Sequence, residues 1–186
     1  MKIAVFCGSS TGNDSIYVNE AEKLGEFFAK HDIDLVYGGG KVGLMGTIAN
    51  AVLDNGGRVY GVIPEYLKEK EIAHTALTEL FVVKDMHERK AKMASMADAF
   101  VALPGGAGTL EEIFEVWTWA QLGHHSKPCA LYNSNGFYQH LLAMITTMTE
   151  SGFLHTKYSE MLILADNPQE LLYRIEAYQP PDKKWS

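Results

Sequence analysis

The sequence has only two cysteines, no long apolar run and few positive charges. Cys7 and Cys129 lie far apart in apolar stretches, so we predict no disulfide framework and a reducing, cytoplasmic location. No apolar stretch approaches the roughly 20 residues of a membrane span. The amino-terminal run Ile3–Cys7 is too short for the core of a signal peptide. Membrane and secreted proteins are therefore disfavoured.

Acidic residues outnumber basic ones by 23 to 16, which gives a net charge of −7. Coating a nucleic-acid backbone requires clustered positive charge, so no nucleic-acid partner is expected. A single phosphate on a small molecule is compatible with this charge, because backbone dipoles can hold it. The seven histidines form no H-E-x-x-H or comparable ligand set. We therefore expect no metal site and no cofactor.

The 186 residues suit one domain. We predict a catalytic domain over residues 1–178 and a polar tail over residues 179–186, with no linker or internal repeat between them. Short apolar runs rich in β-branched residues predict five to seven buried strands. These runs are Ile3–Cys7, Ile33–Tyr37, Arg58–Ile63, Leu80–Val83, Ala99–Leu103, Cys129–Tyr132 and Met161–Leu164.

Helical patterns separate the predicted strands. They cover Ser15–Lys30, Leu44–Leu53, Met86–Met96, Leu110–Leu122, Phe137–Thr149 and Gln169–Ala177. Asp166 or Asn167, before Pro168, predicts a cap for the last helix. Buried strands that alternate with amphipathic helices predict an α/β fold: one Rossmann-like, doubly wound domain, whose mainly parallel sheet carries helices on both faces.

Glycine-rich turns follow three of the predicted strands, at Gly8, at Gly38–Gly40 and within Pro104–Thr109. In open α/β sheets the ligand lies at the carboxyl ends of the strands. Each turn lets backbone N–H groups approach an anion, although for any single turn a purely structural role is the alternative. From these loops we select four candidate binding residues: Gly8, Ser9, Gly40 and Met45.

The segment Gly38-x-Gly40-x-x-Gly43 matches the dinucleotide-binding fingerprint. However, it follows the second predicted strand, whereas the fingerprint normally follows the first. The next predicted strand runs into Pro64, with Glu65 beyond it, and the proline makes this a poor place for the acidic residue that binds ribose. An NAD-dependent dehydrogenase is therefore disfavoured, and no glycine–lysine–serine/threonine sequence ends these loops as a Walker motif would require.

The segment Pro104–Glu112 joins a predicted strand to a helix. Thr109 is expected to cap that helix, where free N–H groups would form a phosphate cradle. Glu112 follows three residues later and completes a capping-box pattern, typically worth about 1 kcal/mol. The capping and the ligand-binding interpretations are compatible, because a capping residue still faces the carboxyl edge of the sheet.

A second informative segment begins with Asp85 and Glu88, which form another possible cap. Arg89 and Lys90 then fall in the first or second turn of a helix, where the helix dipole disfavours cations by roughly 0.3–1 kcal/mol. This placement indicates an anionic partner, either a carboxylate such as Glu112 or a ligand phosphate. A solvated pair of surface cations is the alternative. The helix that carries Arg89 and the helix that carries Glu112 flank the same predicted strand, Ala99–Leu103. Arg89 and Glu112 should therefore face the same cleft.

These two segments together resemble the signature of the LOG ("Lonely guy") family of cytokinin-activating phosphoribohydrolases. The family pattern P-G-G-x-G-T-x-x-E matches Pro104–Glu112, and the preceding M-H-x-R-K matches Met86–Lys90. The resemblance covers the chain from about Lys2 to about Tyr178. Many plant members carry tyrosine at Ala107 and serine at Lys41, and these differences bear on the preferred base.

The resemblance implies hydrolysis of adenine-type (cytokinin) nucleoside 5′-monophosphates, AMP included, to free base and ribose 5-phosphate. The family's catalytic pair falls on Arg89 and Glu112. The implied substrate-binding residues are Glu71, Arg89, Lys90, Gly105, Gly106, Ala107, Gly108, Thr109, Leu110, Glu111, Glu112 and Thr118. Members of this length form homodimers. Similar sequences have been labelled lysine decarboxylases, but no lysine stands out here as a Schiff-base residue.

Two alternatives stay open at this point. A non-catalytic nucleotide carrier or sensor could use the same glycine loops without depending on Glu112. The predicted helix Leu110–Leu122 carries Phe114, Trp117 and Trp119 around much of its circumference. This arrangement suits a core helix and a dimer interface equally.

Overall fold

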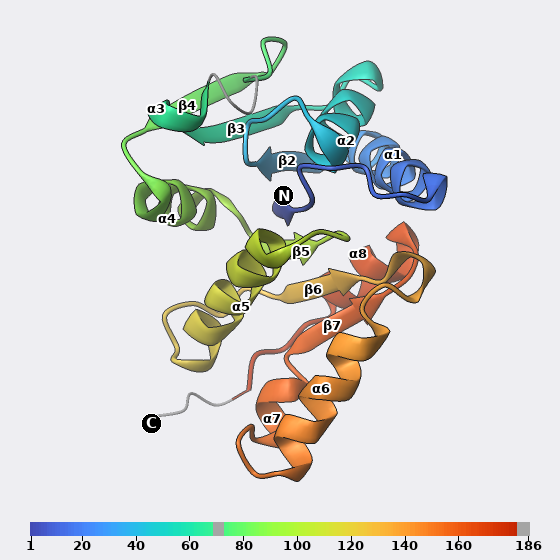
Figure 1. The fold of residues 1–186 in the computed structure, drawn as a ribbon, viewed down its shortest axis with the longest axis vertical. Coiled ribbons are helices and arrows are strands. Elements are labelled where there is room, and N and C mark those ends of the chain that lie inside the picture. Colours follow the sequence, from blue (N-terminus) through green and yellow to red (C-terminus); the bar gives the residue numbers. More distant parts are fainter. Residues whose placement is uncertain (69–72, 182–186) are drawn as a thin grey trace.

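The computed structural model describes residues 1–68 and 73–181 (Figure 1). Seven strands form one sheet in the order β4-β3-β2-β1-β5-β6-β7, and every neighbouring pair is parallel. The strands are β1 (Lys2–Phe6), β2 (Asp34–Tyr37), β3 (Val59–Pro64), β4 (Glu79–Val83), β5 (Ala99–Ala102), β6 (Cys129–Tyr132) and β7 (Leu162–Ala165). The predicted α/β fold with a parallel sheet is confirmed.

Helices cover both faces of the sheet. They are α1 (Ser15–Lys30), α2 (Gly43–Asp54), α3 (Glu65–Lys68), α4 (Met86–Met96), α5 (Ala107–Gln121), α6 (Gln139–Glu150), α7 (Thr156–Ser159) and α8 (Pro168–Glu176), with a 3₁₀ turn η1 (Ser134–Gly136). Residues of α1, α2 and α8 share one apolar core with the sheet, and residues of α4 to α7 share the other. Among the described residues, no helix has the length and apolar character that crossing a membrane requires.

The buried strands place successive side chains in opposite cores. In β1, Ile3 and Val5 enter the core beside α1 and α2, whereas Ala4 and Phe6 enter the core beside α4 and α5. This explains why the central strands are apolar throughout, since neither face meets water. The edge strand β4 exposes Glu79 and Val82, and its sequence pattern is correspondingly less apolar.

The doubly wound topology creates a switch point at β1. The chain winds outward from β1 through β2, β3 and β4 on one side, and then returns to β5 on the other side of β1. The loops that leave the carboxyl ends of β1 and β5 therefore diverge, and a crevice forms between them. Two of the glycine-rich turns, after Cys7 and after Leu103, flank this crevice.

The structure corrects the predicted start of α5. The helix begins at Ala107, and Gly106 is its N-cap residue, with extended backbone angles (φ −90°, ψ −158°) and no side-chain hydrogen bond. Thr109 is thus the third residue of the helix and does not cap it, so the capping-box prediction with Glu112 is wrong. By contrast, Asp85 and Asn167 cap α4 and α8 as expected, because their side chains accept hydrogen bonds from Glu88 N–H and Glu170 N–H.

Candidate functional site

A cavity of about 410 Å³ lies at the switch point. Its walls come from the loop after β1, from α2 and α3, from the first turn of α4 and from the first two turns of α5. The lining residues are Cys7, Gly8, Ser9, Met45, Leu67, Met86, Arg89, Gly106, Ala107, Gly108, Thr109, Glu111 and Glu112. Arg89 and Glu112 thus line the same cavity, the arrangement that strand–helix alternation predicts.

The first turn of α5 presents backbone N–H groups to this cavity. The first hydrogen bond within the helix runs from Leu110 N–H to the Gly106 carbonyl (3.2 Å), so the amides of residues 107 to 109 precede it and have no acceptor inside the helix. A methyl group built at Gly106 or Gly108 would meet no atom within 4 Å. This helix start is therefore open to an approaching anion, which the helix dipole also favours.

Arg89 is only 5% exposed, and backbone carbonyls hold its guanidinium. Nε donates to the Val62 carbonyl (3.1 Å), and Nη2 donates to the Gly38 carbonyl (2.9 Å). Nη1 lies 3.6 Å from the sulfur of Met86. Gly38 has a special part in this arrangement, because a Cβ atom there would collide with Nη2 of Arg89. The guanidinium is thus fixed at the carboxyl ends of β2 and β3.

The pKa of the Cys7 thiol depends on the charges of Arg89 and Glu112. Burial raises the pKa of the Cys7 thiol, the negative charge of Glu112 raises it further, and the positive charge of Arg89 acts in the opposite direction. The thiol is therefore protonated at neutral pH and is a poor nucleophile. Cys7 forms part of the cavity wall, close to both Arg89 and Glu112.

Lys90 lies beside the cavity but outside its lining. Its Nζ contacts the carboxylates of Glu111 (2.6 Å) and Glu115 (3.1 Å), which joins α4 to α5. Burial alone would lower the pKa of Lys90, but these two ion pairs outweigh burial and raise it. The predicted anionic partner of this lysine is therefore a pair of protein carboxylates.

The structure does not bring every predicted site residue into the cavity. Gly40 forms a β-bridge with Ala73, and Gly105 lines a neighbouring cavity. Leu110 and Thr118 lie on α5 outside the lining. Glu71 falls outside the described residues.

Three lining residues were absent from the predicted set: Cys7, Leu67 and Met86. Cys7 ends the first predicted strand, and Met86 begins the segment that resembles M-H-x-R-K, so both positions carried a usable signal. Leu67 belongs to the short helix α3. The apolar periodicity of the sequence gave no signal for a helix of this length.

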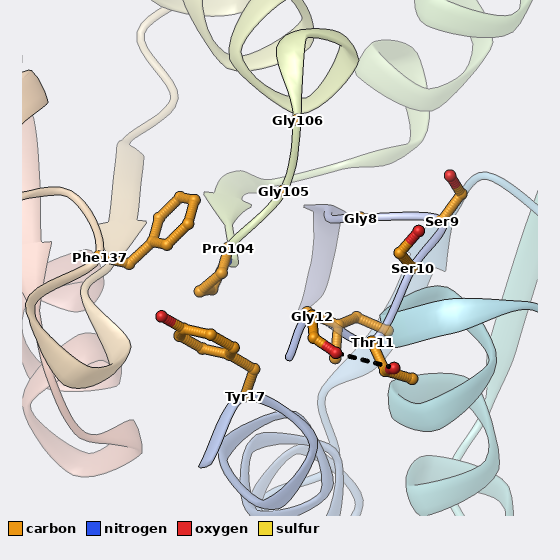
Figure 2. A pocket seen from close by; sticks show the side chains of 11 residues that line it. Gly8, Ser9, Ser10, Thr11, Gly12, Tyr17, Pro104, Gly105, Gly106 and Phe137 are labelled. Atoms are coloured by element: carbon orange, nitrogen blue, oxygen red, sulfur yellow. Dashed lines mark hydrogen bonds between the residues drawn. The ribbon is translucent and has the colours of Figure 1, made fainter. Parts of the chain in front are cut away.

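A second cavity of about 350 Å³ adjoins the first and shares Gly8, Ser9 and Gly106 with it. Figure 2 shows Tyr17, Phe137 and Pro104 on one side of this cavity, and Ser9 and Ser10 on the other. No lining residue among the described ones carries a charged side chain. The full set is Gly8, Ser9, Ser10, Thr11, Gly12, Tyr17, Leu44, Pro104, Gly105, Gly106 and Phe137.

The donor groups at the site bear on metals and cofactors. The described part of the chain contains no group of three or more His, Cys, Asp or Glu side chains placed to hold a metal ion. Pyridoxal phosphate needs a lysine for its Schiff base, and no lysine lines the first cavity within the described ranges. The described lining residues therefore do not fit that cofactor.

Comparison with known proteins adds independent findings. Residues 45–175 match the family model described as "Possible lysine decarboxylase". The chain is 48% identical over 183 residues to the probable cytokinin riboside 5′-monophosphate phosphoribohydrolase LOGL2 of Oryza sativa subsp. japonica, covering 98% of this chain and 75% of that protein. It is 49% identical over 179 residues to the phosphoribohydrolase LOG4 of Arabidopsis thaliana, covering 96% and 83%.

Solved structures share the fold at lower identity. The molybdenum cofactor binding protein of Rippkaea orientalis superposes with a TM-score of 0.71 at 20% identity, covering 95% of both chains. The Moco carrier protein of Chlamydomonas reinhardtii gives a TM-score of 0.70 at 19% identity, again over 95% of both chains. At this identity the likeness concerns the architecture and does not extend to the ligand.

Proposed function

Because the chain belongs to the LOG family of cytokinin riboside 5′-monophosphate phosphoribohydrolases, we propose that it hydrolyses adenine-type nucleoside 5′-monophosphates, AMP included. The chain is an N-glycosyl hydrolase, as its curated relatives are. The products are the free base and ribose 5-phosphate. One observation carries the assignment to this site: Arg89, Glu112 and the open start of α5 all line one cavity.

The 5′-phosphate binds at the amino-terminal turn of α5 in this proposal. The amides of residues 107 to 109 supply hydrogen-bond donors, and the hydroxyl of Thr109 lies in the same turn. Neither Gly106 nor Gly108 has a side chain that would keep a phosphate away. Binding the phosphate fixes the ribose, so a group that does not react holds the reacting carbon in place.

Glu112 then acts at the anomeric carbon. Breaking the bond between C1′ and the base nitrogen leaves positive charge on the ribose ring, and a carboxylate stabilises such a cation or activates the attacking water. Water supplies the hydroxyl group that adds to C1′, and its remaining proton ends on the departing base. Glu112 lies one helical turn beyond the phosphate-binding amides, which suits the short span from a 5′-phosphate to C1′.

Arg89 has an electrostatic and positioning role. Since Val62 and Gly38 already hold Nε and Nη2, the guanidinium meets the substrate without having to move. A cation fixed in this way fits a contact with the oxygens of the ribose. Its reduced freedom before binding lowers the entropy lost when the substrate is ordered.

The test is to incubate the purified protein with AMP and to separate the products by chromatography. We expect free adenine together with ribose 5-phosphate. Glu112→Gln keeps the shape of the side chain but removes its charge, so it should lower kcat by about 100-fold or more. Glu26→Gln, on the exposed face of α1 beside Lys30, is the matched control and should leave turnover unchanged. Near-wild-type turnover in Glu112→Gln would reject the catalytic role.

The same assay separates the enzyme from a nucleotide carrier. A carrier would bind AMP and return it intact, whatever residue stands at position 112. Running isopentenyl-AMP beside AMP measures the preference for the N6 substituent. A kcat/KM for isopentenyl-AMP well above that for AMP would identify the cytokinin nucleotide as the better substrate.

A further inference from the structure

Tyr138 lies outside both cavity linings, yet it contacts the turn that leads into α5. The residue follows η1 and precedes α6, and its side chain is only 1% exposed. Its hydroxyl donates a hydrogen bond of 2.6 Å to the carbonyl of Leu103. Leu103 is the last residue before the Pro104–Gly106 turn, so this bond fixes the point at which the turn leaves the sheet.

The opposite side of the same turn is held by the loop after β1. Gly8 N–H donates to the Pro104 carbonyl (3.1 Å), and Leu103 N–H donates to the Phe6 carbonyl (2.9 Å). The last register pair between β5 and β6 joins Ala102 to Leu131, so Leu103 lies beyond that ladder. On the side of Leu103 that faces β6, the Tyr138 hydroxyl donates to the Leu103 carbonyl and takes the place that a backbone N–H of β6 would have.

Tyr138 is itself held firmly. Asn133 Oδ1 accepts a hydrogen bond from Tyr138 N–H (2.8 Å), and Asn133 N–H donates to the Ala165 carbonyl at the end of β7 (2.8 Å). The ring of Phe137 packs edge-on against that of Tyr138, with centroids 5.0 Å apart, and Figure 2 shows Phe137 beside Pro104. Burial raises the pKa of the Tyr138 hydroxyl, so it remains a hydrogen-bond donor at neutral and mildly alkaline pH.

We propose that Tyr138 is a positioning residue for phosphate binding: its hydroxyl sets where the amino-terminal turn of α5 meets the substrate's 5′-phosphate. The inference rests on the proposed function and deepens it, because it assigns this residue to phosphate affinity and leaves bond cleavage to Glu112. The hydrogen bonds from the α5 amides to the phosphate form when the substrate binds and persist in the transition state, and Glu112 alone acts on the reacting carbon. Loss of the hydroxyl should therefore raise KM and leave kcat nearly unchanged.

The test uses Tyr138→Phe, which removes only the hydroxyl. We expect the Kd for ribose 5-phosphate, measured by calorimetry, and the KM for AMP to rise by about fivefold to tenfold, as for the loss of one well-placed hydrogen bond. The kcat should stay within about twofold, and inhibition by free adenine should not change. Tyr132→Phe is the matched control, because this buried hydroxyl donates to Glu20 (2.7 Å) rather than to the turn.

Several outcomes would overturn the inference. One is an unchanged affinity of Tyr138→Phe for ribose 5-phosphate, and another is an equal loss in Tyr132→Phe. Asn133→Ala provides a second variant, because it removes the hydrogen bond that holds the backbone N–H of Tyr138. It should also weaken the binding of ribose 5-phosphate. Because ribose 5-phosphate binding is measured without turnover, a wild-type protein that fails to hydrolyse AMP would reject the proposed function and still leave this test valid.

Discussion

At the scale of single residues, the site depends on a buried cation held by carbonyl oxygens. Burying a charge is costly unless it is hydrogen-bonded, and the carbonyls of Val62 and Gly38 provide that compensation for Arg89. The sequence predicted that Arg89 lies in the first or second turn of a helix and faces the cleft. It could not predict Gly38 as the partner, because the two lie 51 residues apart and only the sheet order brings them together.

A substitution at Gly38 tests this arrangement. Gly38→Ala would place a methyl group where Nη2 of Arg89 lies, so the guanidinium must shift. We expect kcat/KM for AMP to fall by at least about tenfold, because small displacements of a positioned group are costly. Gly152→Ala is the control: its positive φ (79°) strains an alanine, but nothing lies within 4 Å of the new methyl group. It should lose stability and keep activity, whereas full activity in Gly38→Ala would contradict the prediction.

At the scale of helices and strands, local signals gave reliable predictions where the interaction itself is local. The bounds predicted for Ser15–Lys30 and Met86–Met96 are those observed, and the cap at Asn167 bonds an amide only three residues away. The predicted helix from Phe137 instead begins at Gln139, after a 3₁₀ turn in which Asn135 adopts a positive φ of 52°. Tertiary contacts of the neighbouring Tyr138 fix that turn, and sequence periodicity does not register them.

A half-buried histidine, His125, joins α5 to the segment that precedes β6. Nδ1 of His125 accepts a hydrogen bond from Lys127 N–H (3.1 Å), so Nε2 carries the proton and donates to the Val116 carbonyl (2.8 Å). Burial lowers the pKa of His125, the bond to Val116 opposes this effect, and the charges of Lys127 and His124 lower the pKa further. The folded protein thus favours the neutral ring.

The sign of the pH dependence follows from that preference. As pH falls below the ordinary histidine pKa of about 6.5, the unfolded chain takes up the proton first, so the free energy of unfolding decreases. The stabilisation is complete above that pH and is lost below it. We expect His125→Gln to show a smaller difference in unfolding free energy between pH 7.5 and pH 5.5 than the wild type, measured by urea denaturation. An equal difference in both proteins would contradict this assignment.

At the scale of the whole molecule, sheet order explains how residues from distant segments form one site. A parallel sheet sends the carboxyl ends of all its strands to one edge, so the meeting of Arg89 and Glu112 could be predicted from strand–helix alternation alone. Which neighbouring side chains enter the cavity could not be predicted in this way. Lys90 neighbours Arg89 in sequence, but it turns to Glu111 and Glu115, and Thr118 lies too far along α5 to line the cavity.

The outward face of α5 carries the last prediction. Trp117 is buried, and its indole N–H donates to the Tyr158 carbonyl (3.1 Å), which accounts for one side of the helix. Phe114 and Trp119 are only partly buried, and Leu122 is 41% exposed. Part of the apolar surface of these side chains therefore remains uncovered by residues 1–68 and 73–181, and burial of such a surface drives association.

The sequence resemblance implies a homodimer, and we propose that this face of α5 joins the two copies of the chain. Light scattering at micromolar concentration should then give a mass about twice the 20.6 kDa of one chain. Leu122→Glu places a charge in the contact and should shift the mass toward that of one chain. Tyr173→Glu, on the 72% exposed side chain of α8, should leave the mass unchanged. A wild-type protein that scatters as a single chain would rule out this dimer, and the uncovered face of α5 would then need another explanation.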